Sequence, residues 1–103
     1  MRFLLKALIP VEAGNTVAKK GLLGKTIESI LADLKPEAAY FLDQNGQRAA
    51  FIFFDMQDCS QIPKVAEPWM IALNASIEIH PVMVPDDLKK AEPHIEQAVK
   101  KYA

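Results

Sequence analysis

Two apolar runs joined by the dipeptide Asn45-Gly46 occupy the middle of the chain, between Tyr40 and Phe54. Both central residues of a type I′ turn need a positive φ, which asparagine tolerates and glycine adopts freely. The twist of this turn matches that of two antiparallel strands, so the segment predicts a tight β-hairpin. No other feature restricts the fold as strongly, because the turn decides which residues stand side by side.

The register of the hairpin follows from the position of the turn. With the dipeptide at its centre, Asp43 stands opposite Arg48. These two side chains are therefore expected to form a cross-strand ion pair at the surface. Tyr40 stands opposite Phe51 in the same register, which places both rings on one face of the sheet together with Phe53.

Hydrophobic periodicity predicts the other elements on either side of the hairpin. Alternation with period two is typical of strands, and apolar spacings of three and four residues are typical of helices. Gly21 and Gly24 are expected to break the polar stretch that precedes the first helix. Pro68 is expected to kink the second helix, and Pro93 is expected to divide the last one. The expected elements are a strand over 2–9, a helix over 23–34, a helix over 61–73, a strand over 76–83 and a final helix from 85 onward.

The order of these elements is βαββαβ followed by a C-terminal helix, within a single domain of residues 1–103. Two helical crossovers around a central hairpin are typical of the ferredoxin-like α+β fold, in which helices cover one face of a four-stranded antiparallel sheet. The other face would carry too many apolar side chains to remain in water, so we expect a homodimer. The apolar side chains expected there are Leu4, Leu8, Tyr40, Leu42, Phe51, Phe53 and Val82.

Four short segments, together with the element order and the doubly apolar sheet, resemble a known group of proteins. The segments are Pro36 to Phe41, Ile62-Pro63 with Ala66-Glu67-Pro68, Leu73-Asn74-Ala75, and Glu78 with Pro81-Val82-Met83. The chain resembles the dimeric α+β barrel superfamily, and within it a group of small bacterial proteins of similar length. The resemblance implies two ferredoxin-like sheets that face one another. That superfamily includes cofactor-free monooxygenases, lactone isomerases, haem enzymes and members without known chemistry, and no catalytic residue carries over from it.

Aromatic side chains and a few polar groups share the sheet face that no helix is expected to cover, a combination typical of small-molecule pockets. In such a pocket Lys6 would contact an anion and Tyr40 would donate a hydrogen bond. His80 would act as a general acid or base near neutral pH, and Glu78 lies too far along the same face to be expected as its partner. The candidate ligand-binding residues are Lys6, Tyr40, Phe51, Phe53, Glu78 and His80.

This face is compatible with two functions. In the first, the space between two sheets binds or transforms a small apolar or carbonyl-bearing molecule without a cofactor. In the second, the same residues only fill the dimer interface of a non-catalytic structural or interaction protein. The residues leave both alternatives open.

Charge, cysteine content and the length of the apolar runs indicate which partners and which cellular compartment to expect. The formal net charge is −1, with acidic and basic residues interspersed, so neither nucleic acid nor an anionic membrane is an expected partner. The single Cys59 cannot form an internal disulfide, and Lys6 interrupts the first apolar run too early for a signal peptide. His80 and His94 show no metal-ligand spacing. We therefore expect a cytoplasmic protein without a metal or cofactor.

Overall fold

The computed structural model describes residues 1–103 and shows an α+β fold built on one open sheet. The strands are ordered β2-β3-β1-β4, and every neighbouring pair is antiparallel. The predicted α+β class and the four-stranded antiparallel sheet are therefore confirmed. The strands are β1 (Arg2–Ile9), β2 (Ala38–Gln44), β3 (Gln47–Asp55) and β4 (Ser76–Pro81).

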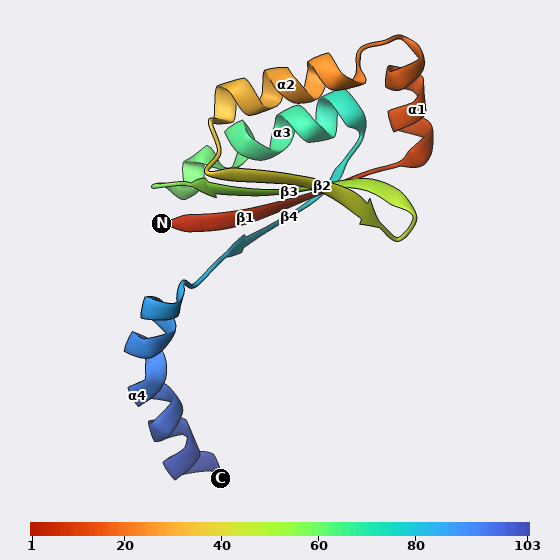
Figure 1. The fold of residues 1–103 in the computed structure, drawn as a ribbon. Coiled ribbons are helices and arrows are strands. Elements are labelled where there is room, and N and C mark those ends of the chain that lie inside the picture. The colour runs from red at the N-terminus through yellow and green to blue at the C-terminus, as the bar shows by residue number, and fades with distance from the viewer.

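Three helices lie together on one side of the sheet, and a fourth extends away on the other side (Figure 1). The three are α1, α2 and α3, and a short 3₁₀ turn, η1, leads into α3. The fourth helix, α4, follows β4 and ends the chain. The bounds are α1 (Val11–Lys19), α2 (Leu23–Leu34), η1 (Cys59–Gln61), α3 (Ile62–Leu73) and α4 (Pro85–Tyr102).

The hairpin forms with the predicted turn and the predicted register. Asn45 and Gly46 have φ values of 53° and 73°. Asp43 is paired in register with Arg48, as expected, but the predicted ion pair between them is wrong. The Arg48 guanidinium instead donates from Nη2 to Asn15 Oδ1 on α1 at 3.0 Å. Arg48 reaches α1 because Gly14 has no side chain there, and a Cβ on Gly14 would lie 2.5 Å from Arg48 Nη1.

Three other expectations about element bounds differ from the structure. The stretch before α2 forms a helix of its own, α1, which ends just before Gly21 at φ 71°. Pro93 does not divide α4, which continues over 18 residues, because a proline removes only one of its many backbone donors. The last strand ends at Pro81 instead of Met83, since proline cannot donate to the sheet ladder.

The hydrophobic core lies between the sheet and the three helices that cover it. Its largest fully buried side chains come from β1, β3 and α3, and no polar or charged residue is buried. The only buried side-chain polar atom without a hydrogen-bond partner is Nε1 of Trp69. The largest side chains of the core are Trp69, Phe54, Leu5, Ile9, Ile52 and Leu73.

The molecule is elongated because α4 projects from the rest of the fold. Its principal dimensions are 58 × 28 × 21 Å, and its radius of gyration is 17.2 Å. A compact chain of this length is expected to have a radius of gyration of about 13 Å. None of the helices has both the length and the apolar character needed to cross a membrane.

Candidate functional site

The sheet face opposite α1, α2 and α3 is called the bare face here, because no helix lies on it (Figure 1). Strand alternation and register decide its membership. Lys6 on β1 stands at its centre, with Phe51 of β3 on one side and Glu78 of β4 on the other. The residues on this face are Arg2, Leu4, Lys6, Leu8, Ala38, Tyr40, Leu42, Gln44, Gln47, Ala49, Phe51, Phe53, Asp55, Ser76, Glu78 and His80. All six predicted site residues are among them.

Aromatic rings form the apolar part of the bare face. Tyr40 and Phe53 meet edge to face, with their ring centroids 6.4 Å apart and their planes at 78°. The ammonium of Lys6 lies 5.2 Å from the centroid of the Phe51 ring, which is within the range of a cation–π contact. Lys6 forms no ion pair, although Glu78 stands opposite it in the register.

A histidine and a carboxylate pair at the edge of the bare face. Nε2 of His80 lies 3.2 Å from Oε1 of Glu78, so the expectation that these residues are too far apart was wrong. Both project from the same side of β4, and the long glutamate side chain spans the two-residue separation. The pair stands on an edge strand and both side chains are at least half exposed. This arrangement allows the carboxylate to orient the imidazole for proton transfer.

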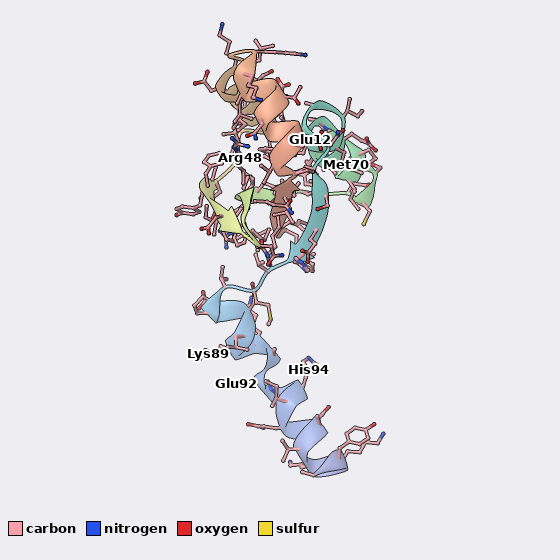
Figure 2. The ribbon with its side chains drawn as sticks, turned by 90° about the vertical axis from the view of Figure 1, so that its right-hand side faces the viewer. Glu12, Arg48, Met70, Lys89, Glu92 and His94 are labelled. Atoms are coloured by element: carbon pink, nitrogen blue, oxygen red, sulfur yellow. The ribbon has the colours of Figure 1, made fainter.

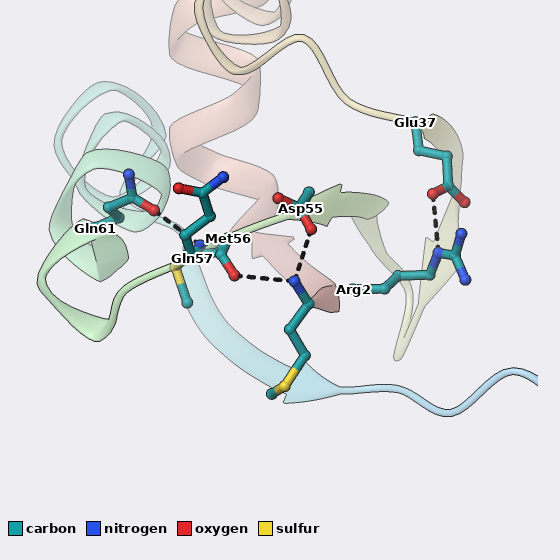
Figure 3. A network of polar contacts seen from close by, with 7 residues as sticks. Arg2, Glu37, Asp55, Met56, Gln57 and Gln61 are labelled. Carbon is teal, nitrogen blue, oxygen red and sulfur yellow. Dashed lines mark hydrogen bonds and ion pairs between the residues drawn. The ribbon is translucent and has the colours of Figure 1, made fainter. Parts of the chain in front are cut away.

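A second group of charges lies at the end of the sheet where β1 begins (Figure 3). Nε of Arg2 donates to Oε1 of Glu37 at 2.9 Å. The N-terminal ammonium of Met1 donates to Oδ1 of Asp55 at 2.7 Å, and it also contacts the carbonyl oxygen of Met56. These contacts hold the start of β1 against the end of β3 and the start of β2.

A groove of about 450 Å³ connects this charged end to the aromatic part of the bare face. Tyr40 and Phe53 line it together with Arg2 and Glu37, and the segment that leads into α4 forms its other wall. Of the six predicted site residues, only Tyr40 and Phe53 lie in this groove. The other four, Lys6, Phe51, Glu78 and His80, lie on the flat part of the face.

Sequence reasoning did not include the two charged residues of this groove, Arg2 and Glu37, among the candidates. Strand alternation does place Arg2 on the same face as Lys6, and that signal was sufficient to include it. Glu37 precedes β2, so no strand pattern indicated where its side chain would point. A larger hollow of about 640 Å³ lies between α2 and α3, and none of the predicted site residues lines it.

Comparison with known proteins gives no family for the chain. No protein-family model matches it, and no curated protein matches it. No three His, Cys, Asp or Glu side chains gather where they would hold a metal ion. The function therefore has to be argued from the bare face and from the chemistry of its side chains.

Proposed function

We propose that this chain is a ferredoxin-like homodimer of the dimeric α+β barrel type, with two bare faces packed against one another. The strand order supports this proposal. The connection from β1 to β2 passes over β3, and the connection from β3 to β4 passes over β1. Each crossover thus skips one antiparallel strand, as in the split βαβ units of ferredoxin-like folds.

The exposed area of the single chain also supports a dimer. A folded monomer of 11.5 kDa is expected to expose about 5,800 Å², whereas this chain exposes 7278 Å². Two chains that each covered an excess of about 1,500 Å² would form an interface of about 3,000 Å², within the range of obligate homodimers. Tyr40 and Leu42 lie on the bare face of the edge strand β2, and they are the kind of exposed apolar side chains that such an interface covers.

Within this dimer, the space between the sheets is proposed to bind a small apolar or carbonyl-bearing molecule. The observation that carries this proposal is the unpaired Lys6 at the centre of an aromatic face. An ammonium that loses its water in an interface needs an acceptor, because burying an unpaired charge is strongly unfavourable. A carbonyl or carboxylate oxygen of a ligand would be that acceptor, and the surrounding rings would contact its apolar part.

The neighbouring polar groups supply what a reaction on such a ligand would need. Tyr40 has a phenolic hydroxyl that donates a hydrogen bond, and His80 with Glu78 accepts or delivers a proton. A Lys6 ammonium beside a carbonyl oxygen would stabilise negative charge as it develops there. None of these steps requires a cofactor.

Sedimentation equilibrium and a fluorescent probe test the two parts of this proposal. The chain should sediment as a dimer at micromolar concentration, and Phe53→Asp should make it monomeric by placing a carboxylate in the interface. The probe 8-anilinonaphthalene-1-sulfonate, which joins apolar rings to an anionic group, should bind the dimer saturably. Lys6→Met should weaken that binding about tenfold or more, the usual effect of losing a charge-assisted hydrogen bond. Lys19→Met, on α1, is the matched control and should leave it unchanged.

Two results would contradict the proposal in different ways. A wild-type chain that stays monomeric at micromolar concentration would exclude the barrel. A dimer that binds no probe, or binds it equally well after Lys6→Met, would show that the side chains of the bare face close the interface. The chain would then be a structural or interaction protein and not a ligand-binding one.

A further inference from the structure

The C-terminal helix α4 carries an apolar stripe that touches nothing in its own chain's core. Leu88 and Val99 on this stripe are 50% and 57% exposed. Figure 2 shows Lys89, Glu92 and His94 on a helix that stands well apart from the rest of the molecule. The stripe follows helical spacing along one side of α4 and consists of Leu88, Ala91, Ile95, Val99 and Tyr102.

A helix of this composition is not expected to remain folded in water by itself. Most helices in proteins owe their stability to packing of an apolar face against other elements, and α4 also has Pro93 inside its 18 residues. An interior proline removes a backbone hydrogen bond and crowds the preceding turn, which is strongly unfavourable in a helix. The acidic first turn and basic last turn of α4 offset only part of this cost. The apolar stripe therefore has to pack against another surface.

We infer that α4 is an arm that packs its apolar stripe against a second copy of this chain. The inference rests on the homodimer proposed above. The arm leaves the sheet on the side of the bare face, away from α1, α2 and α3 (Figure 1). A second copy whose sheet covers the bare face thus lies on the side toward which the arm extends. With a formal net charge of −1, two copies have almost no charge repulsion to overcome.

The area of the sheet contact shows why the arm is needed. The sheet consists of four adjacent strands of about seven residues each, so its face has an area of about 440 Å² per copy. A standard stable interface covers about 800 Å² per partner. An 18-residue helix presents a strip of about 270 Å², and in a two-fold dimer each copy gives one arm and receives one. The sheet and the two arms together give a footprint of about 1,000 Å² per copy, about two thirds of the excess exposed area of about 1,500 Å².

A single substitution in the arm tests this contact, and a matched control lies two residues away. Ile95→Asp places a carboxylate in the stripe, while Gln97→Asp places the same carboxylate on the opposite side of α4. We expect Ile95→Asp to raise the dimer dissociation constant at least about tenfold, as for a central interface residue, and Gln97→Asp to leave it within about twofold. Sedimentation equilibrium of the full chain measures both.

Hydrogen exchange of the wild-type chain distinguishes a second copy from the chain's own surface. Above the dissociation constant, the backbone amides of α4 should be protected, and dilution to monomer should abolish that protection. Protection that does not change with concentration would mean that α4 folds back on its own chain, and absence of protection would mean that it packs on nothing. Either result overturns the inference.

The experiments distinguish an incorrect arm contact from an incorrect dimer. If the wild-type chain is a monomer, both the proposed dimer and the arm contact are excluded. If the wild-type chain is a dimer that Phe53→Asp dissociates but Ile95→Asp does not weaken, the sheet interface stands and the arm contact is excluded.

Discussion

Both faces of the sheet carry apolar side chains, but helices cover only one of them. Along β1, Leu5, Ala7 and Ile9 are 0%, 1% and 2% exposed beneath the helices. Leu4 and Leu8 alternate with them on the bare face and stay partly exposed. An antiparallel sheet with one solvated face normally alternates apolar and polar side chains, and this strand does not. The proposed dimer would supply a second covering layer for these side chains.

The two faces also differ in how polar groups are treated. The covered side buries no polar or charged residue, whereas the bare face carries Lys6, Glu78 and His80 among its rings. A core that only needs stability excludes such groups, because each of them loses water on burial. Their presence on the bare face agrees with the proposed ligand site between two copies. The effect of a substitution on the bare face should therefore depend on protein concentration, and the effect of a substitution on the covered face should not.

Replacing two neighbouring phenylalanines, one on each face, should distinguish the two faces and gives the largest expected change in stability. Phe54 is 1% exposed and stacks on Phe3 with ring centroids 5.9 Å apart. Phe54→Ala should lower the free energy of unfolding by about 3–5 kcal/mol at every protein concentration, because it leaves a cavity in the core. Urea unfolding followed by fluorescence of Trp69, the only tryptophan, measures the loss.

Phe53→Ala is the matched control on the bare face. The free energy of unfolding of Phe53→Ala should differ most from that of the wild-type chain at high protein concentration. Dilution should reduce this difference, because both chains become monomers. Equal losses for Phe53→Ala and Phe54→Ala at all concentrations would show that the two faces do not differ in this way.

A substitution in the hairpin turn tests what keeps the faces distinct. A one-residue slip of β2 against β3 would exchange the two faces of the strand, so the turn must hold the register. Gly46 has a φ of 73°, and Gly46→Ala should cost about 1–2 kcal/mol because a side chain is strained there. The melting temperature should fall by about 4–8 °C for each kcal/mol.

A glycine-to-alanine substitution in α2 should have the opposite effect on the melting temperature. Gly24 lies in the first turn of α2 with open space around it, so Gly24→Ala should raise the melting temperature. If Gly46→Ala were as well tolerated as Gly24→Ala, the turn would not require the left-handed conformation, and another feature would have to fix the register.

Sequence reasoning succeeded where a residue's environment follows from backbone periodicity. The turn at Asn45-Gly46 and the alternation of the first and last strands were enough to place all six candidate residues on one face. It failed for α1, because the residue that α1 buries is Gly14, which adds nothing to a hydrophobic pattern. It also failed for side-chain partners. The choice of Arg48 between Asp43 and Asn15 depends on the space that Gly14 leaves, which no local pattern encodes.

The smallest expected effect comes from Asp58, which caps the turn that leads into α3 on the covered side. Its carboxylate accepts a hydrogen bond from the backbone N–H of Ser60 at 2.8 Å, and this bond lowers the pKa of Asp58 below its usual value. A lowered pKa in the folded state stabilises the fold at pH values above the ordinary aspartate pKa of about 3.9. This stabilisation is lost as the pH falls through the lowered value. Asp58→Ala should therefore reduce the melting temperature slightly at pH 7 and less in strong acid.

The Asp58 cap belongs neither to the bare face nor to the arm. The small change caused by Asp58→Ala should be the same at high and low protein concentration, because the cap acts within one chain. Asp43→Ala, which removes an exposed carboxylate that makes no hydrogen bond, serves as the control for a change in net charge alone. If the effect of Asp58→Ala varied with concentration, the covered side would also respond to association, and the division of the molecule into an internal face and a partner-dependent face would be wrong.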